Sequence, residues 1–138
     1  MKFSIKVQYG LQAMLELALT FGVEPVQIRT IANRQRIPIR FLEQILLVLK
    51  KRDLVVSTRG KKGGYVLARR SDKITLLEII EALDGQIELI SNKMKKAPAL
   101  YEIFEKIEDN IKEQLSETNL DDLAVKKRQK DLVYTYQI

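Results

Sequence analysis

The chain has 138 residues, the size of one domain, and it is 46% hydrophobic and 30% charged, so it can bury a core and is not a disordered chain. It contains no cysteine and no histidine, which excludes a disulfide framework, a thiolate metal site and the commonest general base. The formal net charge is +6, which favours an anionic partner. We therefore expect a binding protein that is not an enzyme and needs neither a metal nor a cofactor.

The sequence has no long apolar run, and its first residues, up to Lys6, are largely polar. A membrane-spanning helix needs about 18 or more consecutive apolar residues, and a secretory signal needs an apolar centre. We expect a cytoplasmic protein that does not associate with a membrane.

Charge is distributed unevenly along the chain. Residues 1–75 hold 15 Lys and Arg against 5 Asp and Glu, whereas residues 76–138 hold 9 against 13. Such an asymmetry is typical of a chain in which one part contacts a polyanion and the other part does something else.

Three helices are predicted in the basic part, over residues 5–21, 27–34 and 38–52, from the 3.6-residue spacing of their apolar side chains. A tight connection at 35–37 joins the second helix to the third, and Pro38 suits the first turn of the third. On that third helix, one face is apolar, with Phe41, Leu42, Ile45 and Leu49. The opposite face carries polar and cationic groups: Arg40, Glu43, Gln44, Lys50 and Lys51.

A β-hairpin follows, with strands over 54–58 and 65–67 and a tip at 59–64 that holds three glycines. β-branched residues favour the strands, and glycine permits a tight turn. The tip also has the Gly-x-x-Gly form of RNA-binding KH loops, but such a loop joins helices, and here it is flanked by strands.

The acidic part begins with a helix over 76–83, which Thr75 and Glu78 cap reciprocally. A linker at 86–97 leads to a long helix over 98–115, then to a short helix after Asn119 and an apolar, aromatic end at 132–138. The long helix has an apolar stripe that needs a partner and predicts a dimer: Leu100, Ile103, Phe104, Ile107, Ile111 and Leu115.

These elements predict a mainly α fold with a small β-hairpin: a winged helix-turn-helix DNA-binding domain over 1–75, then a linker, a long dimerisation helix and a C-terminal tail over 76–138. A major groove admits one helix, whose first turns meet base edges. Arg40 suits guanine or phosphate, Glu43 suits cytosine and Gln44 suits adenine. Taken singly, these side chains are better explained as ordinary solvated surface, or Glu43 as an intrahelical partner of Lys50; it is their joint arrangement with the basic hairpin that favours DNA.

Several short motifs together resemble the BadM/IscR/CymR-type (Rrf-two) family of bacterial winged-helix regulators. They are Lys6, Tyr9-Gly10, the run 41–46, Leu54-Val55, Arg59-Gly60, the run 63–67, Ile79-Ile80 and the run 120–123. The resemblance implies a homodimer, most simply a repressor, on a pseudo-palindromic operator, with Glu43 and Gln44 reading bases and Arg59-Gly60 in the minor groove. The full set of expected DNA-binding residues is Lys2, Ser4, Lys6, Tyr9, Ile39, Arg40, Glu43, Gln44, Lys50, Lys51, Arg59, Gly60, Lys61 and Lys62.

Many members of that family hold an iron–sulfur cluster through cysteines in the loop before the long helix. The corresponding stretch here, residues 89–97, has none, so the resemblance is to a cluster-free branch. The chain ends in Tyr134, Tyr136 and Ile138, which is similar to the ending of cluster-free members that regulate cysteine metabolism. The resemblance implies that this end docks on cysteine synthase through its terminal carboxylate; the alternative is that it packs on its own dimer.

A rival interpretation is a basic protein-interaction module with an acidic, non-DNA partner and a tail that binds a metabolic enzyme. Binding to duplex DNA that weakens steeply with salt would separate the two. An enzyme is disfavoured, since carboxylates such as Glu102 and Glu105 lie on expected exposed helix faces where nothing perturbs them.

Overall fold

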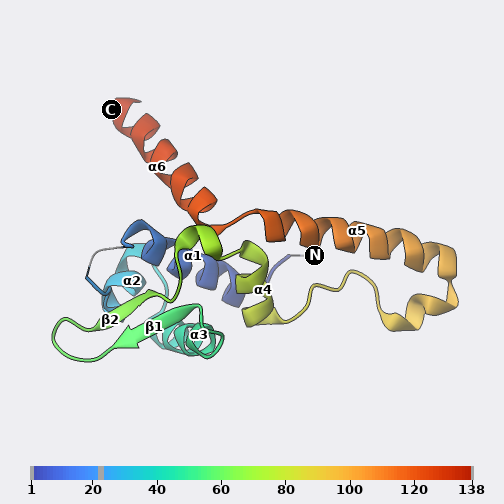
Figure 1. Cartoon of the computed structure of the whole chain (residues 1–138), viewed down its shortest axis with the longest axis horizontal. Coiled ribbons are helices and arrows are strands. Elements are labelled where there is room, and N and C mark those ends of the chain that lie inside the picture. The colour runs from blue at the N-terminus through green and yellow to red at the C-terminus, as the bar shows by residue number, and fades with distance from the viewer. Residues whose placement is uncertain (1, 22–23, 138) are drawn as a thin grey trace.

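The structure is a computed structural model that describes residues 2–21 and 24–137. Its body packs helices around α1, and a helical arm and a second helix project from that body in different directions (Figure 1). The order of the helices and strands is α1 Ile5–Leu19, α2 Ile28–Gln35, α3 Ile39–Lys51, β1 Val55–Thr58, β2 Gly64–Leu67, α4 Leu76–Asp84, α5 Pro98–Glu117 and α6 Leu120–Gln137, with 3-10 helices at Ser71–Lys73 and Asn92–Lys96.

Helices α2 and α3 form the helix-turn-helix that the sequence predicts. Arg36 ends α2 in the left-handed region at φ 55°, and the Ile37 amide donates to the Ala32 carbonyl at 3.0 Å. Pro38 then precedes α3 and lets that helix start in a new direction. The apolar face of α3 is buried, including Leu42 and Ile45.

The two strands form an antiparallel hairpin in which Val55 faces Leu67 and Thr58 faces Gly64. A third segment joins it, because Val26, just before α2, exchanges both backbone hydrogen bonds with Tyr65, at 3.0 and 2.8 Å. A Cβ atom on Gly64 would meet the Val26 carbonyl oxygen at 2.4 Å, so only glycine allows this close approach. The hairpin is therefore tied to the start of α2.

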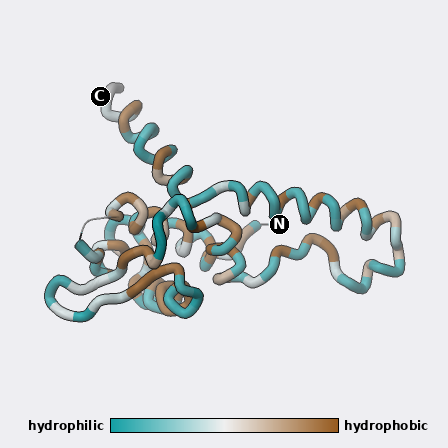
Figure 2. Tube along the Cα trace, viewed as in Figure 1, coloured by the Kyte–Doolittle hydropathy of each residue, from teal (hydrophilic) through white to brown (hydrophobic). Residues whose placement is uncertain are grey.

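Helix α4 completes the body. Thr75 and Glu78 form the expected capping box, and α4 packs against α1 and α3. The core takes in residues from both ends of the chain, from Val7 in α1 to Ile80 in α4 and Leu120 in α6. Hydrophobic stretches therefore gather in the body, whereas they alternate with polar ones along α5 (Figure 2).

The C-terminal end differs from the prediction of a short helix followed by a tail. Helix α6 is continuous from Leu120 to Gln137. Asn119 and Asp122 cap it reciprocally, each backbone amide donating to the other's side chain at 3.0 and 2.8 Å. No glycine or proline follows to end it, and Lys127 pairs with Asp131 one turn on at 2.9 Å. Ile138, and the side chain of Tyr136, lie outside the described residues.

The predicted fold class, mainly α with one small hairpin and a long helix, is confirmed. Apart from α6, the differences are small: α1 stops at Leu19, α5 runs on to Glu117, and the linker contains a 3-10 helix at Asn92–Lys96. Among the described residues, no helix is both long and apolar enough to cross a membrane.

Candidate nucleic-acid interface

The outer face of α3 presents the side chains that the sequence singled out. Ile39, Arg40, Glu43 and Gln44 are all exposed in its first two turns. Their buried neighbours Leu42 and Ile45 hold the helix on the core, so a ligand meets the exposed groups on a fixed support. Leu47 is also exposed, at 53%, on this face.

The C-terminal end of α3 and the hairpin supply the cations. Lys50 and Lys51 are exposed in the last turn of α3. At the hairpin tip, Arg59, Gly60, Lys61 and Lys62 are exposed, and the Gly63 amide closes the turn by donating to the Gly60 carbonyl at 2.9 Å. Within the described residues, the tip's one recorded ion pair is a long one, from Lys62 to Glu24 at 3.8 Å.

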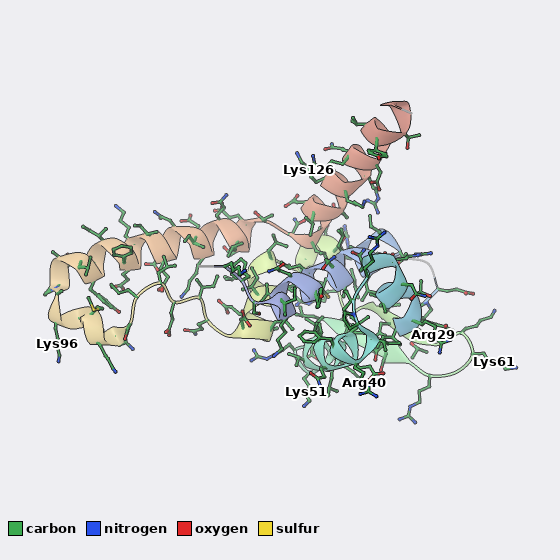
Figure 3. All side chains as sticks on the ribbon, turned by 180° about the vertical axis from the view of Figure 1, so that it is seen from behind. Arg29, Arg40, Lys51, Lys61, Lys96 and Lys126 are labelled. Atoms are coloured by element: carbon green, nitrogen blue, oxygen red, sulfur yellow. The ribbon has the colours of Figure 1, made fainter. Side chains whose placement is uncertain are left out.

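The structure adds Arg29 to this surface, a residue that the sequence analysis did not select. It is exposed on α2 and lies with Arg40, Lys51 and Lys61 along the same side of the body (Figure 3). The neighbouring Gln27 donates its side-chain amide to the Lys61 carbonyl at 3.4 Å. The outward position of Arg29 follows from its place beside buried Ile31 in the helical repeat, which is the signal that could have identified it.

Two of the predicted N-terminal residues, Ser4 and Tyr9, have structural partners within the chain. Ser4 caps α1, accepting from the Val7 amide, and donates to the Asp84 carboxylate at 2.9 Å. Tyr9 is half buried, with its ring edge-on to Phe41 at 5.5 Å between centroids. Lys6 is half buried and Lys2 is exposed. Tyr9 therefore packs against α3 through Phe41.

The predicted dimerisation stripe lies on α5, away from these cations. Leu100, Ile103, Phe104 and Ile107 are exposed, with Ile103 at 61%. Ile111 and Leu115 are half buried, and Leu115 packs against the core. Within the described residues, the outer half of the stripe has no apolar cover.

Comparison with known proteins shows which family this chain matches and which regulators it is similar to. Residues 3–126 match the Rrf2 family, described as iron-dependent transcriptional regulators. The HTH-type transcriptional regulator CymR of Bacillus subtilis is 40% identical over 124 residues, 90% of each chain. The HTH-type regulator IscR of Sodalis glossinidius is 41% identical over 88 residues, 64% of this chain and 53% of that protein, so this chain spans about half the length of that relative.

A solved structure agrees with the sequence comparison. The structure of CymR, the global cysteine regulator of B. subtilis, superposes with a TM-score of 0.80 at 38% identity, covering 91% of this chain and 97% of that one. These relatives are transcriptional regulators and not enzymes.

The residues of this chain do not fit the iron that the family's description mentions. Iron–sulfur clusters are held mainly by cysteine thiolates, with histidine as the common substitute, and the chain has neither residue. Among the described residues, no three carboxylates gather closely enough to hold a metal ion.

Proposed function

This chain belongs to the Rrf2 family of helix-turn-helix transcriptional regulators, and we propose that it acts as a homodimeric repressor that binds a pseudo-palindromic operator without an iron–sulfur cluster. The DNA-binding winged-helix domain is residues 1–75, and residues 76–138 supply the arm for dimerisation and the terminal helix. Ile39, Arg40, Glu43 and Gln44 face the bases, and Lys50 and Lys51 contact phosphates.

The exposed polar face of α3 is the observation that carries this proposal. A helix in the major groove reads bases with hydrogen-bonding side chains such as Arg, Gln and Glu in its first turns, and Arg40, Glu43 and Gln44 are exposed there. The tip residues Arg59 and Lys61 are exposed at the end of a hairpin that is tied to α2. A fixed wing of this kind suits the narrow, electronegative minor groove.

Two kinds of contact are separable by mutation. Arg59→Ala removes a cation from the wing, so it should weaken binding to all duplexes and reduce the slope of log affinity against log salt by about one. Glu43→Ala should instead relax preference at one base pair, with discrimination falling by about 1–3 kcal/mol. Both are measured by fluorescence anisotropy at several salt concentrations. A Glu43→Ala chain that changes only the salt slope would remove the base-reading role.

The homodimer rests on α5. Its exposed apolar residues form a stripe on a helix that leaves the body. Apolar side chains in such a row are unfavourable in water and typically mark an interaction surface. Two-fold pairing through α5 also presents two copies of α3 to successive turns of one DNA face, which is how dimeric helix-turn-helix proteins bind palindromes.

The regulated genes are proposed to be those of cysteine and sulfur metabolism. The support is the 40% identity to CymR over 90% of each chain, together with the naming of that relative as the global cysteine regulator of its organism.

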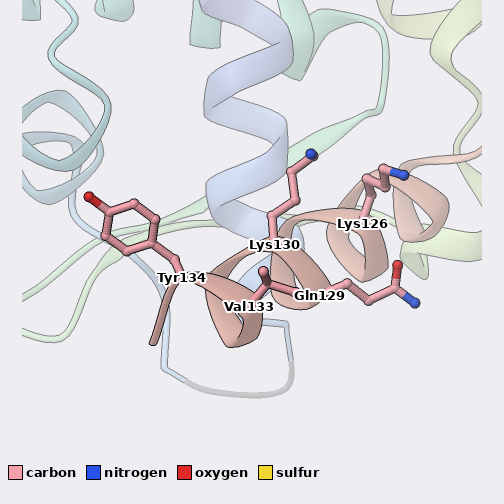
Figure 4. Close-up of a pocket in the computed structure, with 5 residues that line it drawn as sticks. All are labelled: Lys126, Gln129, Lys130, Val133 and Tyr134. Carbon is pink, nitrogen blue, oxygen red and sulfur yellow. The ribbon is translucent and has the colours of Figure 1, made fainter. Parts of the chain in front are cut away.

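Helix α6 is proposed to carry a docking end for cysteine synthase, formed by Tyr134, Tyr136 and Ile138. The support is that Leu132, Val133 and Tyr134 are 58–70% exposed on the part of α6 that leaves the body. Lys126, Gln129, Lys130, Val133 and Tyr134 line a hollow of ≈ 460 Å³ along this helix (Figure 4). An end of this kind offers a partner an aromatic side chain, cations and a terminal carboxylate.

Calorimetric titration of purified cysteine synthase with the full chain tests the docking end. Deleting Ile138, or adding one alanine after it, should abolish the heat of binding, because either change moves the carboxylate by about 3.3–3.6 Å. DNA affinity should not change in either variant. Equal heats from all three chains, or no heat from the unaltered chain, would remove the cysteine synthase proposal.

A further inference from the structure

The linker and α5 form one structural arm, covering residues 86–117. The Leu89 amide donates to the Glu108 carboxylate at 2.8 Å, and the Tyr101 hydroxyl donates to the Asn92 side chain at 3.4 Å. The linker therefore runs back along α5, and the 3-10 helix Asn92–Lys96 lies at the far end of the arm (Figures 1 and 3).

The tip of this arm is basic and has an exposed apolar side chain. Residues 92–97 include Lys93, Lys95 and Lys96 and no acid. In the described part of the chain none of the three lysines is in an ion pair; Lys95 lies 5.8 Å from the centre of the Tyr101 ring. Met94 stands among them with 37% of its surface exposed.

A pocket with the complementary chemistry lies where the arm joins the body, between the N-terminal segment, the end of α4 and residues 86–89 at the base of the arm. Its volume is ≈ 560 Å³, and Phe3, Ile80, Ile87 and Leu89 give it an apolar lining. Its charged lining residues are Asp84, Glu88 and Lys2. The surrounding segment is acidic, since residues 76–91 hold four Asp and Glu and no Lys or Arg.

We propose that the arm tip of one copy docks in this pocket of a second copy, and that the contact is reciprocal. Met94 enters the apolar pocket, and the tip lysines lie against Asp84 and Glu88. The inference rests on the proposed homodimer and specifies which surfaces meet in it.

The geometry of a two-fold dimer supports this occupant. Helix α5 has 20 residues, so it is about 30 Å long at 1.5 Å per residue. Antiparallel pairing of two such helices sets the first turn of each beside the last turn of the other. The tip of one arm then reaches the body of the second copy near α4, which packs against α5. Opposite charges at this place fix the register and orientation of the pair.

Exchanging the charges between the two surfaces tests the contact. One chain carries Lys93→Glu, Lys95→Glu and Lys96→Glu, and the other carries Asp84→Lys and Glu88→Lys. Each alone juxtaposes like charges in its homodimer, so its dimer dissociation constant at low salt should rise about tenfold or more. An equimolar mixture restores opposite charges at both contacts, and its heterodimer should recover to within about threefold of the unaltered chain.

Analytical ultracentrifugation gives these constants, with thermal melts to check that each chain is folded. If either altered chain is unfolded, the cysteine-free sequence allows a second measurement. A Met94→Cys chain mixed with a size-tagged Gln86→Cys chain should form a disulfide-linked heterodimer under mild oxidation, whereas a Lys61→Cys control on the wing should not.

The outcomes separate this inference from the proposed function. If the unaltered chain is a dimer that binds DNA, but the mixture shows no recovery or the Met94 to Gln86 link does not form, the docking contact is wrong and the regulator stands. If the unaltered chain is monomeric at micromolar concentration, the homodimer itself is wrong, and the docking contact is wrong with it.

Discussion

At the scale of single residues, the least expected feature is a buried carboxylate between α1 and α2. Glu16 of α1 is only 5% exposed. It accepts from the Arg34 guanidinium and the Gln35 amide, both at 3.2 Å, and both of these residues lie on α2. A buried charge is tolerated only when it is paired in this way. Glu16 therefore locks the angle between α1 and α2, on which the placement of α3 depends.

Glu16→Ala should lower the free energy of unfolding by about 1–3 kcal/mol, because the Gln35 amide loses its acceptor and a cavity remains. Urea denaturation measures this loss. The matched control is Glu24→Ala, whose side chain is 70% exposed and lies 3.8 Å from Lys62; its effect should stay within about 0.5 kcal/mol. Equal losses of unfolding free energy in the two variants would show that the contacts of Glu16 with α2 do not stabilise the fold.

At the scale of elements, periodicity predicted the two faces of α3 well, because an apolar repeat on one side fixes what the other side exposes. It predicted α6 badly. Periodicity predicts a tail at residues 132–138, although the cap at Asn119 is followed by residues with no helix breaker before Gln137. The absence of a helix breaker decided the conformation of this segment. Its apolar side chains Leu132, Val133 and Tyr134 are exposed and do not pack on the core.

The pairing of Val26 with Tyr65 could not be predicted from the sequence. It consists of backbone hydrogen bonds between segments distant in the sequence, and the side chains of Val26 and Tyr65 give no sign of it. Gly64 allows the close approach of Val26 to the hairpin, but in the sequence it cannot be distinguished from the other glycines of the turn. The helical repeat of α2 could have shown that Arg29 points outward, but its place beside the hairpin depends on this same pairing of distant segments.

The exposed apolar stripe of α5 is predicted to hold the dimer together. Changing Ile103 and Ile107 together to Asp should give a monomer by light scattering, because both side chains are exposed in the single chain and carry the stripe. Ile111 is left unchanged because it is half buried in the single chain, so altering it would also disturb packing within the subunit. Affinity for a full operator should fall about 100-fold or more, since the two half-sites are no longer linked.

Lys106→Ala is the control for α5, since Lys106 is exposed on the same helix outside the apolar stripe. That variant should remain dimeric and bind DNA normally. A dimer that survives both Asp substitutions would mean that the subunits meet elsewhere.

At the scale of the whole molecule, the uneven charge of the sequence has a spatial meaning. The excess of cations in residues 1–75 includes Arg29, Arg40, Lys51 and Lys61, which lie along one side of the body, whereas Lys96 lies at the far end of the arm (Figure 3). The two basic surfaces are thus separate, and the partners proposed for them differ: a duplex for the first and the acidic pocket of a second copy for the other. The sequence showed the asymmetry but not this division, which depends on how far the arm extends.

Selection of bound duplexes from a random pool tests the central claim most directly, namely that this chain reads a specific, two-fold symmetric DNA site through α3. The account predicts enrichment of a pseudo-palindrome whose half-sites are about 34–36 Å apart, centre to centre, or a multiple of one helical turn. Bound duplexes with no common sequence, or with a single unrepeated half-site, would contradict it.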